Sequence, residues 1–127
     1  MKKVLCDTNV FIKMFSGGTV ASANLLHIGS QNVLIPSIAV MELFAGMGNK
    51  QELADMRKKL KHYNILDLNE HCSKLAISLV HDYKLSHNMQ IPDALIGAMA
   101  ITYNIPLFTY NLKDFRFMPN IELYEII

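Results

Sequence analysis

The sequence is poor in cysteine and has no long apolar run, and we expect no signal peptide at its start. Cys6 and Cys72 are its only two cysteines, and they form neither a CxxC motif nor a recognisable disulfide framework. We expect both to be reduced thiols that pack in the interior. Polar residues break every apolar stretch before the roughly 18 residues of a membrane span, and the run after Lys3 stops at Asp7, too early for a signal peptide. These absences predict a cytoplasmic protein.

An excess of charge of one sign is also lacking. Twelve Lys and Arg oppose eleven Asp and Glu, which leaves a formal net charge of +1. This balance provides no general attraction for nucleic acid, so a nucleic-acid contact would require a local patch. No repeat, linker or low-complexity segment is visible. The length therefore predicts one domain, residues 1–127, and a hydrophobic content of 51% is enough for a closed core.

Short apolar runs alternate with segments of helical periodicity. Runs at 3–6, 33–35, 65–66 and 107–109 predict buried strands, and 122–124 predicts an edge strand. Helices are predicted at 10–15, 19–28, 37–45, 50–62, 70–83 and 92–103. Strands that alternate with helices predict parallel pairing, with helices on both faces of the sheet. The expected fold is therefore a three-layer α/β domain, which binds its ligand at the carboxyl ends of the strands.

The ends of three helices are marked by particular residues. Ser37 and Asn69 are placed to cap the helices that follow them. Gly46 and Asn104 stand where the helices at 37–45 and 92–103 should stop.

Four carboxylates stand at the ends of the apolar segments or within them. Asp7 closes the first strand, Glu42 interrupts an apolar helix, Asp93 opens another helix, and Asp114 follows the strand at 107–109. An all-oxygen cluster suits hard cations such as Mg²⁺ or Mn²⁺, and two such ions held together hydrolyse phosphodiester bonds by in-line attack. We therefore predict a metal site formed by these four acids.

Each acid also has a structural explanation. Asp7 could cap the helix that follows it, Asp93 could complement a helix dipole, and Asp114 could belong to a turn. Glu42 is harder to explain in this way, because an ionised carboxylate among apolar neighbours costs several kcal/mol unless it is paired or bound to metal. The prediction of a site thus depends on the four acids converging at one edge of the sheet.

The helix at 50–62 could dock RNA phosphates. Its basic residues on one face are Lys50, Arg57, Lys58 and Lys61. Asp55 and Lys59 are spaced as an i,i+4 pair, so an ordinary solvated helix is the alternative.

Other side chains give weaker signals. The five histidines form no metal-binding motif, although His87 lies in the loop before Asp93. Some apolar surface around Phe11, Phe15 and Phe44 could remain for a second copy or a partner helix, with burial in the core as the alternative.

Four segments occur in an order that is more specific than any one of them. They read LCDTNVFI at 5–12, IPS at 35–37 with MEL at 41–43, DALIGA at 93–98, and TYNLKDF at 109–115. In this order they resemble the PIN-domain ribonucleases of the VapC toxin type, over nearly the whole chain.

The resemblance implies a parallel, roughly five-stranded sheet, a Mg²⁺- or Mn²⁺-dependent endoribonuclease, a homodimer and an inhibitory antitoxin partner. It assigns catalytic and metal-binding roles to Asp7, Glu42, Asp93 and Asp114. It adds Thr8, Thr109 and Asn111 as supporting groups.

Three other functions stay open. A PIN nuclease that processes RNA without being a toxin would carry the same acids. A non-catalytic scaffold of the same fold would have lost one or more of them, and all four are present. A receiver-type phosphoacceptor module would need an aspartate closing a central strand near mid-chain, where Asp55 instead lies in a charged helix.

Overall fold

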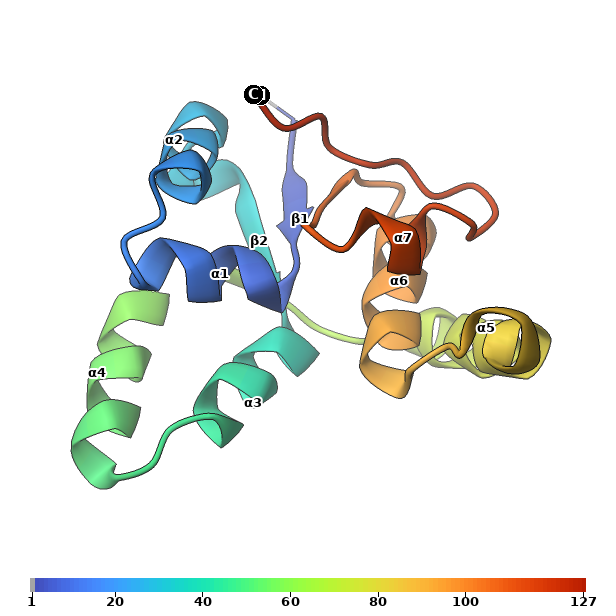
Figure 1. Cartoon of the computed structure of the whole chain (residues 1–127), viewed down its shortest axis with the longest axis horizontal. Coiled ribbons are helices and arrows are strands. Elements are labelled where there is room, and N and C mark those ends of the chain that lie inside the picture. The colour runs from blue at the N-terminus through green and yellow to red at the C-terminus, as the bar shows by residue number, and fades with distance from the viewer. Residues whose placement is uncertain (1) are drawn as a thin grey trace.

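The computed structural model describes residues 2–127, in which short strands alternate with helices (Figure 1). The strands are β1 (Val4–Cys6), β2 (Val33–Pro36), β3 (Asn64–Leu66) and β4 (Leu107–Phe108). The helices are α1 (Thr8–Phe15), α2 (Thr19–Ile28), the 3₁₀ turn η1 (Ser30–Asn32), α3 (Ser37–Ala45), α4 (Lys50–Leu60), α5 (Glu70–His87), α6 (Ile91–Tyr103) and α7 (Leu112–Phe115). The prediction of alternating elements is confirmed.

The strands form one parallel sheet in the order β3-β2-β1-β4, with β1 in its centre. The expectation of a fifth strand at 122–124 is wrong. That segment makes a single parallel bridge, between Leu107 and Leu123, with the Leu107 N–H donating to Glu122 O (2.9 Å) and the Tyr124 N–H donating to Leu107 O (2.8 Å). Strand β4 has only two residues, so a fifth strand beside it could form only a very short ladder of hydrogen bonds.

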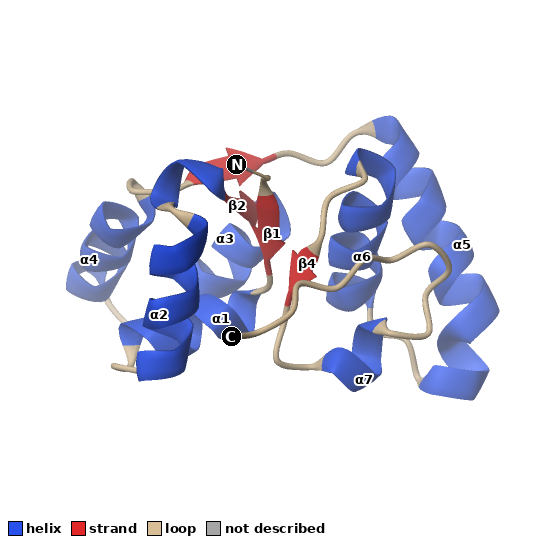
Figure 2. Cartoon of the chain, turned by 90° about the horizontal axis from the view of Figure 1, so that it is seen from above, coloured by secondary structure: helices blue, strands red, loops and turns tan. Residues whose placement is uncertain are grey.

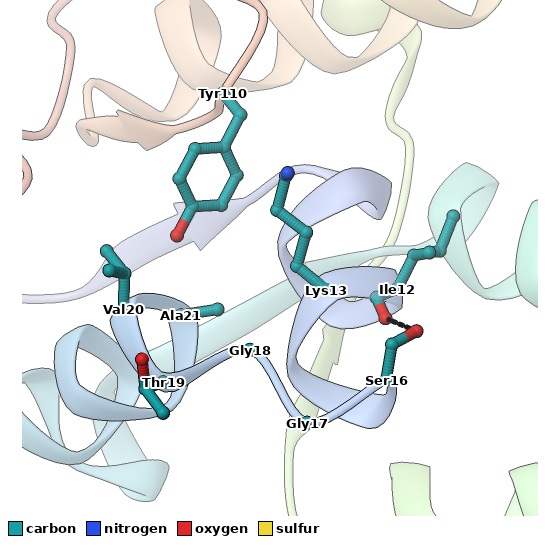
Figure 3. A pocket seen from close by; sticks show the side chains of 9 residues that line it. All are labelled: Ile12, Lys13, Ser16, Gly17, Gly18, Thr19, Val20, Ala21 and Tyr110. Carbon is teal, nitrogen blue, oxygen red and sulfur yellow. Dashed lines mark hydrogen bonds between the residues drawn. The ribbon is translucent and has the colours of Figure 1, made fainter.

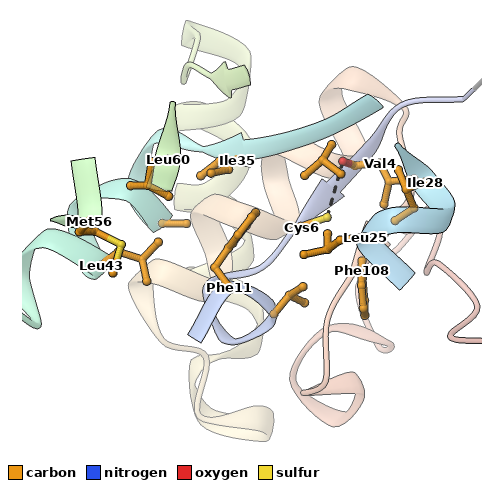
Figure 4. Packing of buried hydrophobic residues seen from close by; sticks show 13 residues of the cluster. Val4, Cys6, Phe11, Leu25, Ile28, Ile35, Leu43, Met56, Leu60 and Phe108 are labelled. Carbon is orange, nitrogen blue, oxygen red and sulfur yellow. Dashed lines mark hydrogen bonds between the residues drawn. The ribbon is translucent and has the colours of Figure 1, made fainter. Parts of the chain in front are cut away.

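Helices cover both faces of the sheet (Figure 2). Alternate side chains of β1 explain this arrangement, because Val4 and Cys6 enter one core whereas Leu5 enters the other. The first core, shown in Figure 4, lies between the sheet and α1, α2, α3 and α4. The second lies between the sheet and α5, α6 and α7. The predicted three-layer α/β architecture is confirmed.

Both cysteines are free and have no exposed surface, as predicted. Burial, with a smaller contribution from the charge of Asp7, raises the pKa of the Cys6 thiol far above its ordinary value. Within residues 2–127, no helix combines the length and the apolar character that crossing a membrane would require.

The helix ends match the sequence in part. The Asn69 side chain accepts a hydrogen bond from Cys72 N (2.8 Å) and caps α5, and Asn104 ends α6 in a left-handed conformation with φ 54°. Ser37 does not cap α3. Strand β2 continues through Pro36, which occupies the cap position without a side-chain hydrogen bond, so Ser37 is already helical.

Asn24 of α2 holds the end of the chain against the first core, although it has no exposed surface. Its Oδ1 accepts hydrogen bonds from the Tyr124 hydroxyl (3.0 Å) and from Ile127 N (2.9 Å), and its Nδ2 donates to Val20 O (2.8 Å). One buried amide therefore satisfies polar groups from two distant segments.

We expect Asn24→Ala to lower the free energy of unfolding by about 2 kcal/mol, because it removes a buried amide whose Oδ1 accepts two hydrogen bonds. Tyr124→Phe removes only one of these donors and should cost about 1 kcal/mol. Urea unfolding followed by circular dichroism measures both. A loss for Asn24→Ala no larger than that for Tyr124→Phe would show that the amide network contributes little.

Candidate active site

The central strand β1 delivers a buried carboxylate to the carboxyl edge of the sheet. Asp7 follows β1 directly, is only 5% exposed, and its N–H donates to Phe108 O (2.9 Å). Its Oδ1 accepts from Thr8 N (2.8 Å), which caps α1, and its Oδ2 accepts from the Thr109 hydroxyl (2.8 Å). Asp7 therefore does cap a helix, yet its second oxygen is held in place by a residue that follows β4.

The loop after β4 is tied to this carboxylate. Thr109 has no exposed surface, and its Oγ1 also accepts a hydrogen bond from Asn111 N (3.0 Å). Thr109 thus orients Asp7 as the resemblance implies, whereas Asn111 contributes its backbone. The Tyr110 N–H donates to Asn9 Oδ1 (3.4 Å), which joins the same loop to α1. Sequence reasoning missed Asn9, although it lies two residues after Asp7 in the first matched segment.

Glu42 reaches the same edge from α3, where its Oε1 accepts a hydrogen bond from the Thr8 hydroxyl (2.8 Å). The expectation that Glu42 is desolvated among apolar neighbours is wrong, because its side chain is exposed. The helical stripe beside it, which includes the buried Leu43, turns toward the core and leaves Glu42 at the surface.

Asp93 and Asp114 complete the cluster. Asp93, in the first turn of α6, is half-buried, and Asp114 is exposed on α7. Burial raises the pKa of Asp93 to about 6, and the charges of Asp7, Asp114 and Glu42 contribute in that order. Burial also raises the pKa of Asp7, with hydrogen bonds from Thr109 and Thr8 opposing the shift and the charges of Glu42 and Asp114 adding to it. The charges of the other three acids thus contribute to the raised pKa of Asp93, and the roles of the four acids in one site stay a prediction.

No basic side chain neutralises this cluster within residues 2–127, where the ion pairs are Lys2–Glu122, Lys74–Glu70 and His81–Asp82. The donors are all carboxylate oxygens, which fit a hard cation. In the conformation described for residues 2–127, however, no group of three His, Cys, Asp or Glu side chains is close enough to coordinate one ion. The exposed side chains of Glu42 and Asp114 have room to reorient, and metal binding by the four acids stays a prediction.

The basic residues proposed to contact RNA lie on or just after α4. All of Lys50, Arg57, Lys58 and Lys61 are exposed, and Lys61 lies just beyond the helix, which ends at Leu60 rather than at residue 62. The predicted pair of Asp55 with Lys59 is not formed. Asp55 accepts a hydrogen bond from Gln51 (2.9 Å), and Lys59 lies 5.2 Å from the centre of the Phe15 ring. RNA binding by this helix stays a prediction.

The three phenylalanines proposed for a partner surface divide into two groups. Phe11 has no exposed surface and belongs to the core, so its proposed role in docking is wrong. Phe15 and Phe44 are half-buried and line hollows of about 290 and 300 Å³ beside α4.

A hollow of about 530 Å³ lies at the turn between α1 and α2, and none of the four acids lines it (Figure 3). In it, the Lys13 ammonium lies 5.0 Å from the centre of the ring of Tyr110, the residue after Thr109.

The profile of the PIN domain matches residues 4–119. The chain belongs to the PIN domain family. Among curated proteins, Ribonuclease VapC from Rickettsia bellii (strain RML369-C) is 43% identical over 44 residues, which are 35% of this chain and 33% of that protein. The chain thus aligns with about a third of the length of this relative.

Solved structures show the same PIN fold. A toxin-antitoxin complex from Klebsiella pneumoniae matches with a TM-score of 0.79 and 31% identity, covering 98% of this chain and 100% of that chain. DNA-bound VapBC from Salmonella typhimurium matches with a TM-score of 0.84 and 19% identity, covering 100% of both chains. The resemblance of this PIN domain to VapC-type toxins is confirmed, and the second match supports the fold alone.

The raised pKa of Asp93 predicts how stability depends on pH without metal. The unfolded chain has the ordinary pKa of 3.8, so the folded protein binds more protons between about pH 4 and 6. Its stability therefore falls as the pH rises through this window and stays reduced above it. In EDTA at pH 8, Asp93→Asn should be more stable than wild type by about 1–2 kcal/mol after allowance for solvent screening, and less dependent on pH.

Thermal melts of both proteins at pH 4.5 and pH 8 provide the measurement. If Asp93 acted only on the helix dipole, the substitution would instead cost about 0.3–1 kcal/mol at pH 8. A less stable variant at that pH would therefore argue against the raised pKa of Asp93.

Proposed function

We propose that this PIN domain is a metal-dependent endoribonuclease and the toxin of a toxin–antitoxin pair. The observation that carries the proposal is the convergence of four carboxylates, without a basic partner among the described residues, at the carboxyl edge of a parallel sheet. Ligand sites of open α/β sheets lie at this edge. Membership of the PIN family and the similarity to Ribonuclease VapC support the same activity.

In this proposal, Asp7, Glu42 and Asp93 would hold Mg²⁺ or Mn²⁺ directly or through water. Asp114 would be an outer ligand or would position a second metal ion. When bound, such a cation lowers the pKa of a water molecule and offsets the negative charge that develops on the phosphate. The chain itself needs no covalent nucleophile.

The role of the neighbouring groups follows from their hydrogen bonds. Thr109 and the backbone of Thr8 each donate to one oxygen of Asp7, so this carboxylate keeps its orientation while substrate binds. The Thr8 hydroxyl donates to Glu42 and restrains the otherwise exposed side chain. Donors of this kind position metal ligands and tune their basicity.

The alternatives differ in what supports them. A PIN nuclease that processes RNA without being a toxin would use the same site and differs only in its effect on growth. A non-catalytic scaffold has no need of four mutually repelling acids. The receiver-type alternative lacks its acceptor, because Asp55 is exposed in the middle of α4.

Asp7→Asn should lower the rate of RNA cleavage by at least about 100-fold, because it removes charge that the transition state needs. Chelation with EDTA should abolish cleavage by the wild type, and Mg²⁺ or Mn²⁺ should restore it. The measurement is cleavage of labelled single-stranded RNA by purified protein.

Asp82→Asn is the matched control, because Asp82 is an exposed aspartate of α5 that pairs with His81 outside the cluster. It should cleave RNA at the wild-type rate. An Asp7→Asn protein that still cuts RNA normally would remove Asp7 from the catalytic site.

The proposed antitoxin has a suitable apolar surface available. The hollows lined by Phe15 and Phe44 lie beside α4, where Leu53 is 40% exposed, and Ile12 of α1 nearby is 52% exposed. Arg57 and Lys59 border them, so an apolar segment that carries acidic residues would fit. We also propose that the protein is cytoplasmic and forms a homodimer. Sedimentation at micromolar concentration would test whether it is a dimer.

Leu53→Lys should leave the toxin active but weaken its inhibition by an antitoxin by at least about tenfold, because a charge would enter an apolar contact. The assay is growth of cells that express the toxin together with the product of an adjacent small reading frame. Leu85→Lys, at a fully exposed position of α5, should be inhibited like the wild type. Wild-type expression that leaves growth unchanged would favour the RNA-processing alternative.

A further inference from the structure

Three aromatic rings pack against one another where the carboxyl end of α5 meets the segment after α7, and two of them, His87 and Phe117, are stacked. The Phe117 ring centre lies 4.9 Å from that of Tyr83 and 3.9 Å from that of His87, and the planes of Phe117 and His87 differ by only 20°. Tyr83 and Phe117 are half-buried, whereas His87 is exposed. The exposed His87 ring is therefore supported by two half-buried aromatic rings, one of which, Phe117, it stacks on.

A hollow of about 270 Å³ connects this stack to the acidic site. His87 and Phe117 line it together with Asp93, Asp114 and Lys113. Figure 2 shows the reason, since α7 lies at the same end of the layer as the loop between α5 and α6. The volume is at the lower end of ligand sites, which suits one nucleotide rather than a longer segment.

The end of α5 that carries the exposed His87 ring, and the loop that follows it, are held in place before any ligand binds. Asn88 ends α5 in a left-handed conformation with φ 51°, and its Oδ1 accepts a hydrogen bond from Lys84 Nζ (2.9 Å). Gln90 Nε2 donates to Asn88 O (3.0 Å), and His87 Nδ1 is hydrogen-bonded to Ser86 Oγ (2.8 Å). A preformed ring loses less conformational entropy on binding than a mobile one.

The polar groups of the hollow complement the parts of a nucleotide. Lys113 is exposed and forms no ion pair within residues 2–127, so its ammonium is available to a phosphate. Gln90 uses its amide N–H within the loop, which leaves its carbonyl oxygen for a donor on a base. An aromatic face, a cation and an amide are the groups with which proteins bind single-stranded RNA.

We propose that this hollow binds one nucleotide of a single-stranded RNA beside the bond that is cut, with the base stacked on His87 and a phosphate near Lys113. The inference rests on the proposed ribonuclease function and defines a subsite within it. Bases in a duplex are already stacked and paired, so single-stranded RNA is the class that reaches the ring. Stacking accepts any base, and selection among bases falls to Gln90.

The test measures binding in the full chain carrying Asp7→Asn, so that RNA stays intact. The probes are short single-stranded oligoribonucleotides with 2-aminopurine at one position, whose fluorescence is quenched when the base stacks on an aromatic ring. We expect quenching at one position of the series. His87→Ala should remove it and weaken binding about tenfold, whereas His87→Phe should restore both, because it keeps the aromatic face.

Two further variants separate stacking from other effects. His81→Ala removes another exposed histidine of α5, outside the hollow, and should bind RNA like the parent protein. Lys113→Gln should weaken binding and lower the dependence of log affinity on log salt by about 0.7, the contribution of one phosphate contact to a single strand.

Distinct results would overturn the subsite. If His87→Phe bound as weakly as His87→Ala, the imidazole rather than a stacking face would be responsible. If His87→Ala kept its RNA affinity but lost Mn²⁺ affinity in calorimetry, the hollow would serve a hydrated cation. Binding is measured without cleavage, so a protein that quenches the probe but never cuts RNA retains the subsite and loses the proposed activity. If His87→Ala with Asp7 intact cleaved RNA with an unchanged KM, the proposed activity would stand and the subsite would be wrong.

Discussion

Parallel pairing around β1 is the constraint on which the rest of the structure depends. Parallel strands cannot be joined by tight turns, so every connection must cross a face of the sheet, and helices cover both faces. The same pairing brings the carboxyl ends of the strands to one edge. Asp7 and Thr109, which follow adjacent strands, meet there although 102 positions separate them in the chain. The site is thus a direct consequence of how the sheet is connected.

The acidic edge illustrates a conflict between stability and chemistry. Hydrogen bonds from Thr8 and Thr109 favour the ionised form of Asp7, but burial and neighbouring carboxylates oppose it. Asp93 experiences the same opposition with its pKa raised to about 6. A sequence selected only for folding would not keep such groups together, since removing like charges is an easy route to greater stability. The cation proposed above would compensate this cluster.

Local patterns predicted most of the fold, because each strand and helix carries its own periodicity. The position of Asp7 directly after a buried strand likewise predicted that its carboxylate would lie at the carboxyl edge of the sheet. What failed depends on tertiary packing. The segment at 122–124 has strand-like residues, but its partner β4 is too short, and the exposure of Glu42 depends on how α3 sits against its neighbours. The stacking of His87 on Phe117 involves residues 30 apart and leaves no local signal.

The two thiols offer a way to observe motions of the molecule. Cys6 lies in the centre of the sheet and Cys72 faces the second core from α5, and neither has any exposed surface. An alkylating reagent can therefore reach them only when the surrounding layer opens. Alkylation of Cys6 reports separation of the sheet from the first core, whereas alkylation of Cys72 reports detachment of α5. The native protein thus carries two internal reporters of local unfolding, and its surface is free for a single engineered cysteine label.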